Sequence, residues 1–216
     1  MALIKDREWK QEAAYHTDHG FVLSMGNRKM GRVMSFSLPP IVTCNKDAPC
    51  KHDCYAVKMA KIYPTVKNSW QNNLELLDKY WGTDFVNDID AAIRKKQPEL
   101  FRWFVGGDIP AVWFIDNMVQ IAKDNPDVSF WCFTKQFGYL ERYNEKVPDN
   151  LTFILSVWPP LVPSDDLKEK YGCCYFQDKA GSYSVPEDAY VCQGDCEECQ
   201  VCTYLDAGES VVIIKH

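Results

Sequence analysis

The sequence lacks any apolar run near the ~20 residues that a transmembrane helix requires. Its first eight residues, MALIKDRE, are rich in charge and lack the apolar stretch of a secretory signal peptide. Repeats, low-complexity tracts and linker-like segments are absent as well. These absences argue against membrane-spanning, exported and repeat-built proteins, so we expect a cytoplasmic globular protein with no membrane partner.

An excess of basic charge is also lacking. The formal net charge is −6, which opposes the broad basic surface typical of non-specific nucleic-acid binding, and we find no strong sequence evidence for a nucleic-acid partner. Hydrophobic residues make up 46% of the chain and charged residues 25%, a composition that argues against disorder. The 216 residues suffice for one sizeable core.

Strand-like and helix-like segments alternate along most of the chain. The residues from 1 to 31 are polar and weakly periodic, and we expect an N-terminal extension with one short helix there. The predicted strands are 32–38, 101–105, 128–134, 151–157, 173–176 and 210–215, and the predicted helices begin near residues 54, 65, 84, 111, 139 and 164. We therefore expect a single α/β domain over 32–216 with a mostly parallel sheet. An open doubly wound sheet and a partial (β/α)6 barrel both fit this pattern.

Cysteine is abundant, and its clustering is the main functional signal. In a reducing compartment, clustered cysteines are more often metal ligands or catalytic thiols than disulfide partners. Three of the ten cysteines lie outside the clusters, and we expect them to be buried as small hydrophobic residues: Cys132, Cys173 and Cys174.

The first cluster is Cys44-x5-Cys50-x3-Cys54, in a loop between a predicted strand and a predicted helix. Three thiolates in eleven residues can surround one compact metal cluster. A tetrahedral zinc site would need a fourth ligand, and the nearest candidate, His52, lies between two cysteines where its side chain is expected to point away. A 4Fe–4S cluster held by three cysteines would instead leave one iron open for a cofactor or substrate.

The second cluster is Cys192-x3-Cys196-x2-Cys199-x2-Cys202, within an accessory segment at 192–204. Structural zinc usually uses two ligand pairs separated by a longer loop. Continuous spacing of two and three residues is instead typical of ferredoxin-like ligation. We favour a second 4Fe–4S cluster here, with zinc as the alternative.

Polar residues near the ends of the predicted strands are further candidates for the site. Gly106-Gly107-Asp108 ends the second strand, where the site of a parallel α/β protein is built. Lys135, Ser156 and Trp158 follow or end the next strands and could line the same site, although a structural role is the simpler expectation for each.

The chain resembles the phage "gene product 88" family over most of residues 27–204. The resemblance lies in Asn27-x-Lys29, Ser35-Phe36-Ser37-Leu38-Pro39, the Cys44…Cys50…Cys54-Tyr55-Ala56 loop, Gly107-Asp108 and the C-terminal cysteines. It implies a protein of phages or mobile elements and no particular reaction.

The chain is also similar, more distantly, to radical S-adenosylmethionine enzymes. In that family a cysteine loop after the first strand binds a 4Fe–4S cluster, and a Gly-Gly-Glu after the second strand helps to bind the methionine amino group. The corresponding residues here are the loop with Cys44, Cys50 and Cys54, and the turn Gly106-Gly107-Asp108. The usual cysteine spacing in that family is C-x3-C-x2-C, from which this loop departs. The resemblance implies a partial (β/α)6 barrel.

These observations lead to one main hypothesis and two alternatives. The main hypothesis is a radical S-adenosylmethionine-like iron–sulfur enzyme, with one or two 4Fe–4S clusters, S-adenosylmethionine bound at residues 106–108, an unidentified substrate and a reductase as partner. The first alternative is a non-catalytic metal-binding protein that uses zinc or iron–sulfur. The second is an electron carrier that does not use S-adenosylmethionine.

Overall fold

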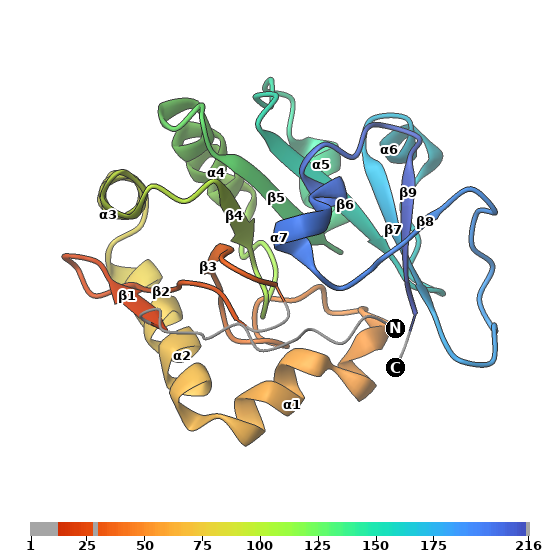
Figure 1. The fold of residues 1–216 in the computed structure, drawn as a ribbon, viewed down its shortest axis with the longest axis horizontal. Helices are drawn as coiled ribbons and strands as arrows, with labels where there is room; N and C mark the ends of the chain where they lie inside the picture. Colours follow the sequence, from red (N-terminus) through yellow and green to blue (C-terminus); the bar gives the residue numbers. More distant parts are fainter. Residues whose placement is uncertain (1–12, 28–29, 215–216) are drawn as a thin grey trace.

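The computed structural model of the chain describes residues 13–27 and 30–214 (Figure 1). The strands are β1 (Ala14–His16), β2 (Val22–Ser24), β3 (Met34–Phe36), β4 (Leu100–Trp103), β5 (Ser129–Thr134), β6 (Leu151–Val157), β7 (Gly172–Gln177), β8 (Tyr190–Val191) and β9 (Ser210–Ile214). The helices are α1 (Tyr55–Ile62), α2 (Pro64–Lys79), α3 (Thr83–Lys96), α4 (Val112–Asp124), α5 (Phe137–Arg142), α6 (Asp165–Lys168) and α7 (Cys196–Cys199), with the short 3-10 helices η1 (Pro49–Asp53) and η2 (Val201–Thr203).

All nine described strands belong to one sheet, in the order β1-β2-β3-β4-β5-β6-β7-β9-β8. The pairs from β3 to β9, and β9 with β8, are parallel, whereas β1 and β2 add to the β3 edge in antiparallel fashion. Six parallel strands therefore follow one another in chain order. A doubly wound sheet reverses its strand order at a switch point, and these strands do not. The fold is thus a mixed α/β arrangement with a singly wound parallel sheet.

One face of the sheet carries the main core. The apolar stripe of α3, which includes Phe85 and Ile89, packs with Phe114 of α4 against strand residues such as Phe36 and Trp103. Residues of α5 and α6 join the same cluster. Helices that follow successive parallel strands and return to the same face produce this arrangement, because such crossovers are right-handed.

The opposite face is covered by the C-terminal segment instead of by long helices. Its buried cluster contains the strand residues whose side chains point to this face, among them Trp131 and Ile154. Leu205, from the segment after η2, packs with them. The 3-10 helix η2 contacts β5 and β6, and Figure 1 shows α7 drawn across the middle strands of the sheet. The second cysteine group therefore lies on the face of the sheet that the core helices leave open.

The part of residues 1–31 that the structure describes forms strands, not the expected short helix. Phe21 and Leu23 are fully buried in the main core, so this segment packs as an edge of the sheet. Residues 1–12 and 28–29, with Lys29, lie outside the described residues. The strands predicted at 128–134 and 151–157 are confirmed as β5 and β6.

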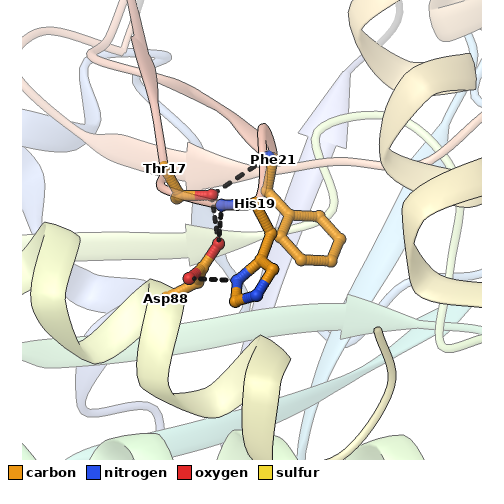
Figure 2. A network of polar contacts seen from close by, with 4 residues as sticks. All are labelled: Thr17, His19, Phe21 and Asp88. Carbon is orange, nitrogen blue, oxygen red and sulfur yellow. Dashed lines mark hydrogen bonds and ion pairs between the residues drawn. The ribbon is translucent and has the colours of Figure 1, made fainter. Parts of the chain in front are cut away.

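A polar network fastens the β1–β2 hairpin to α3 (Figure 2). Asp88 of α3 is only 5% exposed, and its carboxylate accepts hydrogen bonds from the Thr17 hydroxyl and, at 3.0 Å, from the His19 backbone N–H. The His19 ring Nδ1 lies 2.8 Å from the second carboxylate oxygen. The Thr17 hydroxyl in turn accepts the backbone N–H of Phe21. This network explains how a short, polar hairpin keeps a fixed position on the sheet.

No helix of the described residues is long and apolar enough to cross a membrane.

Candidate functional site

The first cysteine group lies at the carboxyl ends of the parallel strands. The chain leaves β3, forms a loop with Cys44, enters η1 with Cys50, and starts α1 directly after Cys54. All three thiols are half-buried, whereas His52 is exposed.

Hydrogen bonds tie this loop to the neighbouring strand ends. The Thr43 hydroxyl accepts the backbone N–H of Asp108 at 3.1 Å, which joins the loop to the end of β4. The Asn45 side-chain amide donates to the Lys135 carbonyl at 2.9 Å, and the Gln136 amide donates to the Thr43 carbonyl at 3.0 Å. The loop is therefore held at β4 and β5 by bonds that involve no cysteine.

The two glycines at the end of β4 make room for this loop and for α2. A Cβ on Gly106 would lie 2.6 Å from the Trp70 ring of α2. Gly107 has a φ of +80°, and a Cβ there would lie 2.7 Å from both the Leu38 carbonyl oxygen and the Thr43 hydroxyl. Only a residue without Cβ fits either position. Both glycines are thus required by the packing of this site.

The Asp108 carboxylate is buried and engaged by the protein. It accepts hydrogen bonds from the Thr134 hydroxyl at 2.7 Å, and from the backbone N–H groups of Lys135 and Ile109, both at 2.8 Å. Burial raises the pKa of Asp108, while these three hydrogen bonds and the nearby Lys135 ammonium oppose the rise. Asp108 therefore joins the ends of β4 and β5, and most of its hydrogen-bonding capacity is used inside the fold.

Lys135, Ser156 and Trp158 meet at the ends of β5 and β6. The Lys135 ammonium donates to the Ser156 hydroxyl at 2.7 Å and lies 5.9 Å from the centre of the Trp158 ring. The Trp158 ring stacks in parallel on Phe176 with centroids 3.6 Å apart. The structure thus brings these three candidates together, next to the loop that contains Cys44.

The pKa of the Cys44 thiol, in the first group, is shifted by its surroundings. Burial raises the pKa of Cys44 to about 11, a backbone N–H donated by Ile41 opposes this, and Asp108, Cys54 and Cys50 add smaller increases. The part of the loop with Thr43 and Cys44 therefore lies beside the Gly-Gly-Asp turn.

A cavity of about 520 Å³ borders this region. Its walls include Pro39 and Pro40 before the cysteine loop, Val57 of α1, and Trp70 of α2 above Gly106. Small-molecule sites commonly have volumes in this range and mostly apolar walls. The lysines Lys61 and Lys67 add positive charge to it.

The four cysteines of the second group line one small cavity. They come from the strand end after β8, from both ends of α7, and from η2. The cavity has a volume of about 30 Å³, and its walls include the four cysteines together with Trp131 of β5. This volume holds about two water molecules, so a metal cluster would require the segment to open slightly.

Backbone and side-chain contacts fix α7 to the segment before β3. The Glu197 N–H donates to the Met30 carbonyl at 3.1 Å, and the Glu197 carboxylate pairs with the Arg32 guanidinium at 2.6 Å. A Cβ on Gly31 would collide with the Glu197 side chain. These contacts hold the accessory segment across the sheet.

Neighbouring thiols act on the pKa of Cys202 in the second group. Burial raises the pKa of Cys202, and Cys174, Cys192 and Cys196 raise it further, while Arg102 opposes the increase. Cys174 is buried on the same face of the sheet, as was predicted of the three isolated cysteines. Metal binding would have to displace these protons, because a metal ligand is a thiolate.

No group of three or more His, Cys, Asp or Glu residues within 13–27 and 30–214 has a geometry ready to hold a metal ion. Three cysteines suit a 4Fe–4S cluster with one open iron, and four cysteines suit an iron–sulfur cluster or zinc, but in both groups the sulfur atoms would have to shift. The structure thus gathers the predicted cysteines without arranging them as ligands.

Comparison with known proteins identifies the family. The family described as Gene product 88 matches residues 4–158, more than half of the chain. The chain belongs to the gene product 88 family. It is 31% identical over 158 residues to the "Gene 88 protein" of Mycobacterium phage L5. This match covers 66% of the present chain and 64% of the phage L5 protein. The chain is also 31% identical over 161 residues to the "Gene 88 protein" of Mycobacterium phage D29, covering 68% and 65%.

The matched regions span slightly less than two thirds of each relative's length. The family match includes the first cysteine group and residues 106–108, but it ends before the second cysteine group. The match also begins at residue 4, earlier than the resemblance at residue 27 indicated. No solved structure matches the chain.

Sequence reasoning missed Thr43 and Asn45, which attach the cysteine loop to the neighbouring strands. Small polar residues directly beside Cys44 were the available signal, because Thr and Asn side chains commonly bond to nearby backbone.

Proposed function

We propose that this member of the family is a cytoplasmic iron–sulfur protein of phage or mobile-element type. Cys44, Cys50 and Cys54 would hold a 4Fe–4S cluster at the carboxyl end of the sheet, and Cys192, Cys196, Cys199 and Cys202 would hold a second one. The support is the gathering of three half-buried thiols in one anchored loop and of four thiols around one cavity. Such clusters supply one-electron chemistry when bound.

The finer proposal is a radical S-adenosylmethionine-like enzyme with a partial (β/α)6 barrel. The observation that favours it most is the contact between the cysteine loop after β3 and the Gly106-Gly107-Asp108 turn after the neighbouring strand β4. Six parallel strands in chain order are also the order of a partial barrel.

The residues near the first cluster have distinct roles in this proposal. Gly107 would keep the turn packed against Leu38 and Thr43, and Asp108 would accept a hydrogen bond from the cofactor's ammonium through a remaining lone pair. The cavity beside Trp70 would take the adenosyl part or the substrate. Lys135 and Ser156, at the next strand ends, would contact bound substrate.

A non-catalytic metal-binding protein is the second candidate. The engagement of Asp108 by three protein donors favours it, because those bonds leave little capacity for a cofactor. In this candidate the metal, as zinc or iron–sulfur, fastens the C-terminal segment to the sheet, or the clusters only carry electrons.

The test is cleavage of S-adenosylmethionine by protein loaded anaerobically with iron and sulfide. Dithionite supplies the electron that cleaves the sulfonium bond, the resulting 5′-deoxyadenosyl radical takes a hydrogen atom from the buffer or the protein, and methionine and 5′-deoxyadenosine are measured by chromatography. We expect slow formation of both products by the wild type and none by Cys50→Ala. A fully loaded wild type that neither binds nor cleaves the compound would contradict the enzyme proposal and leave the second candidate.

A further inference from the structure

Three buried polar atoms in one row of the sheet have no hydrogen-bond partner among the described residues: Ser35 Oγ, Arg102 Nε and Trp131 Nε1. Ser35 lies beside Arg102 across β3 and β4, and Arg102 lies beside Trp131 across β4 and β5. Residues in register share a face of a sheet, so the three side chains emerge together. Buried donors without an acceptor cost free energy, and three in one row indicate a common ligand.

The row faces the C-terminal cysteine segment. Trp131 is 1% exposed and lines the same cavity as Cys192, Cys196, Cys199 and Cys202. The next residue across the sheet, Thr152, donates its hydroxyl to the Thr203 carbonyl at 2.8 Å, which fixes η2 above the row. The cysteines therefore line the cavity together with Trp131, and Arg102 and Ser35 follow Trp131 along the row.

Arg102 gives this row a positive charge. Its guanidinium lies 5.0 Å from the centre of the Phe133 ring and contacts the Met30 sulfur at 3.4 Å. Among the described residues, no carboxylate forms an ion pair with it. A half-buried cation beside several thiols is stabilised by an anion, and a metal centre held by four thiolates carries net negative charge.

We propose that Ser35, Arg102 and Trp131 form a donor floor for an anionic iron–sulfur cluster held by the four C-terminal cysteines, and that they raise its reduction potential. This inference rests on the proposed function, of which it specifies the second cluster. Hydrogen bonds and positive charge near cluster sulfur favour the reduced, more negative state.

The opposite face of the sheet supplies a matched control. Trp103 of β4 is also fully buried, and its indole Nε1 also lacks a partner among the described residues. Its ring packs in the main core against Phe101 and Phe114, away from the cysteine segment. Trp103→Phe and Trp131→Phe therefore remove the same group from two faces of one sheet.

The experiment uses the full chain loaded anaerobically with iron and sulfide, and follows each cluster by electron paramagnetic resonance during a redox titration. Cys50→Ala and Cys196→Ala assign the signals to the two groups. For the second cluster we expect Arg102→Leu and Trp131→Phe to lower the potential, with Arg102→Lys closer to the wild type and Trp103→Phe unchanged. Iron loss to a chelator should be about tenfold faster in Trp131→Phe than in Trp103→Phe, the usual size of an outer-shell effect.

The outcomes separate the two proposals. A second cluster with the same potential and iron-loss rate in Trp131→Phe and Trp103→Phe would overturn the donor floor and leave the proposed function intact. Iron at the first group with zinc or no metal at the second would overturn the donor floor together with the second cluster, and would leave the first cluster of the proposed function intact. A wild type that takes up no iron and sulfide at either group would overturn both.

Discussion

The two cysteine groups differ in how the fold holds them. The first group lies in a loop that hydrogen bonds attach to the ends of β4 and β5, and it falls inside the family match. The second group lies in a short segment laid over one face of the sheet, outside that match. Contacts of Glu197 and Thr203 also hold the second segment, but this segment supplies four thiols to a metal and the first loop only three. We therefore expect metal to contribute more to the order of the second segment than to that of the first loop.

The largest expected effect is the loss of metal from the second group. Binding at free-metal concentrations about 1,000-fold above the dissociation constant stabilises the folded state by about 4 kcal/mol. Chelation should remove this stabilisation from the wild type. It should also expose the amides of residues 192–203 to hydrogen exchange, while the amides of residues 43–54 stay protected. Mass spectrometry and thermal unfolding measure both effects.

The double variant Cys196→Ala, Cys199→Ala is the control for this prediction. Because it lacks two of the four ligands, the variant should unfold at the temperature of the chelated wild type, and added metal should not raise this temperature. If its stability equals that of the loaded wild type, metal does not hold this segment.

The next effect is on the anchor of the first loop. Asp108→Ala removes the acceptor of three buried hydrogen bonds and should lower the free energy of unfolding of metal-free protein by about 3 kcal/mol. Asp127→Ala, at an exposed position, should change it little. Denaturant titration of both variants measures the difference, and equal stability would mean that the loop is not anchored through Asp108.

A smaller effect is expected from the packing of the glycine turn. Gly107→Ala would place a Cβ 2.7 Å from the Leu38 carbonyl oxygen and the Thr43 hydroxyl. Gly208 has nearly the same φ, +82° against +80°, but a Cβ there meets nothing within 4 Å. Gly107→Ala should therefore destabilise the protein by about 1–2 kcal/mol more than Gly208→Ala. Similar losses in the two variants would show that backbone strain alone matters.

The smallest effect concerns the hairpin that neither cysteine group touches. The hydrogen bond to Asp88 raises the pKa of His19 above 6.5, burial opposes this, and the charges of Asp88, Asp84 and Asp18 add to the rise. A raised folded-state pKa means that the stabilisation is complete below pH 6.5 and is lost as the pH rises through the higher value. The stability difference between wild type and His19→Gln should shrink over that interval. A difference independent of pH would contradict the pairing.

The sequence could predict the long apolar elements of the fold but not its short edge strands. Long apolar runs identified β5, β6 and the helices of the main core, and the chain order of strands placed the first cysteine loop beside Gly107. The strands β1 and β2 were missed because each has only three residues and polar neighbours. Their position depends on tertiary contacts such as that between His19 and Asp88.

The site was predictable in its cysteines but not in their surroundings. Two of the three partners of Asp108, Thr134 and Lys135, lie at the end of β5 and follow from the three-dimensional pairing of strands. The sequence predicted strands at 101–105 and 128–134 but no functional role for Arg102 or Trp131. A signal was present, because an arginine between Phe101 and Trp103 is unusual in a strand this apolar.

The most direct test is the metal content of anaerobically purified protein, measured with acid-labile sulfide in the wild type, Cys50→Ala and Cys196→Ala. We predict a brown wild type with iron and sulfide, and a partial loss of both in each variant. Stoichiometric zinc without iron in the wild type, even after reconstitution with iron and sulfide, would contradict the iron–sulfur proposal.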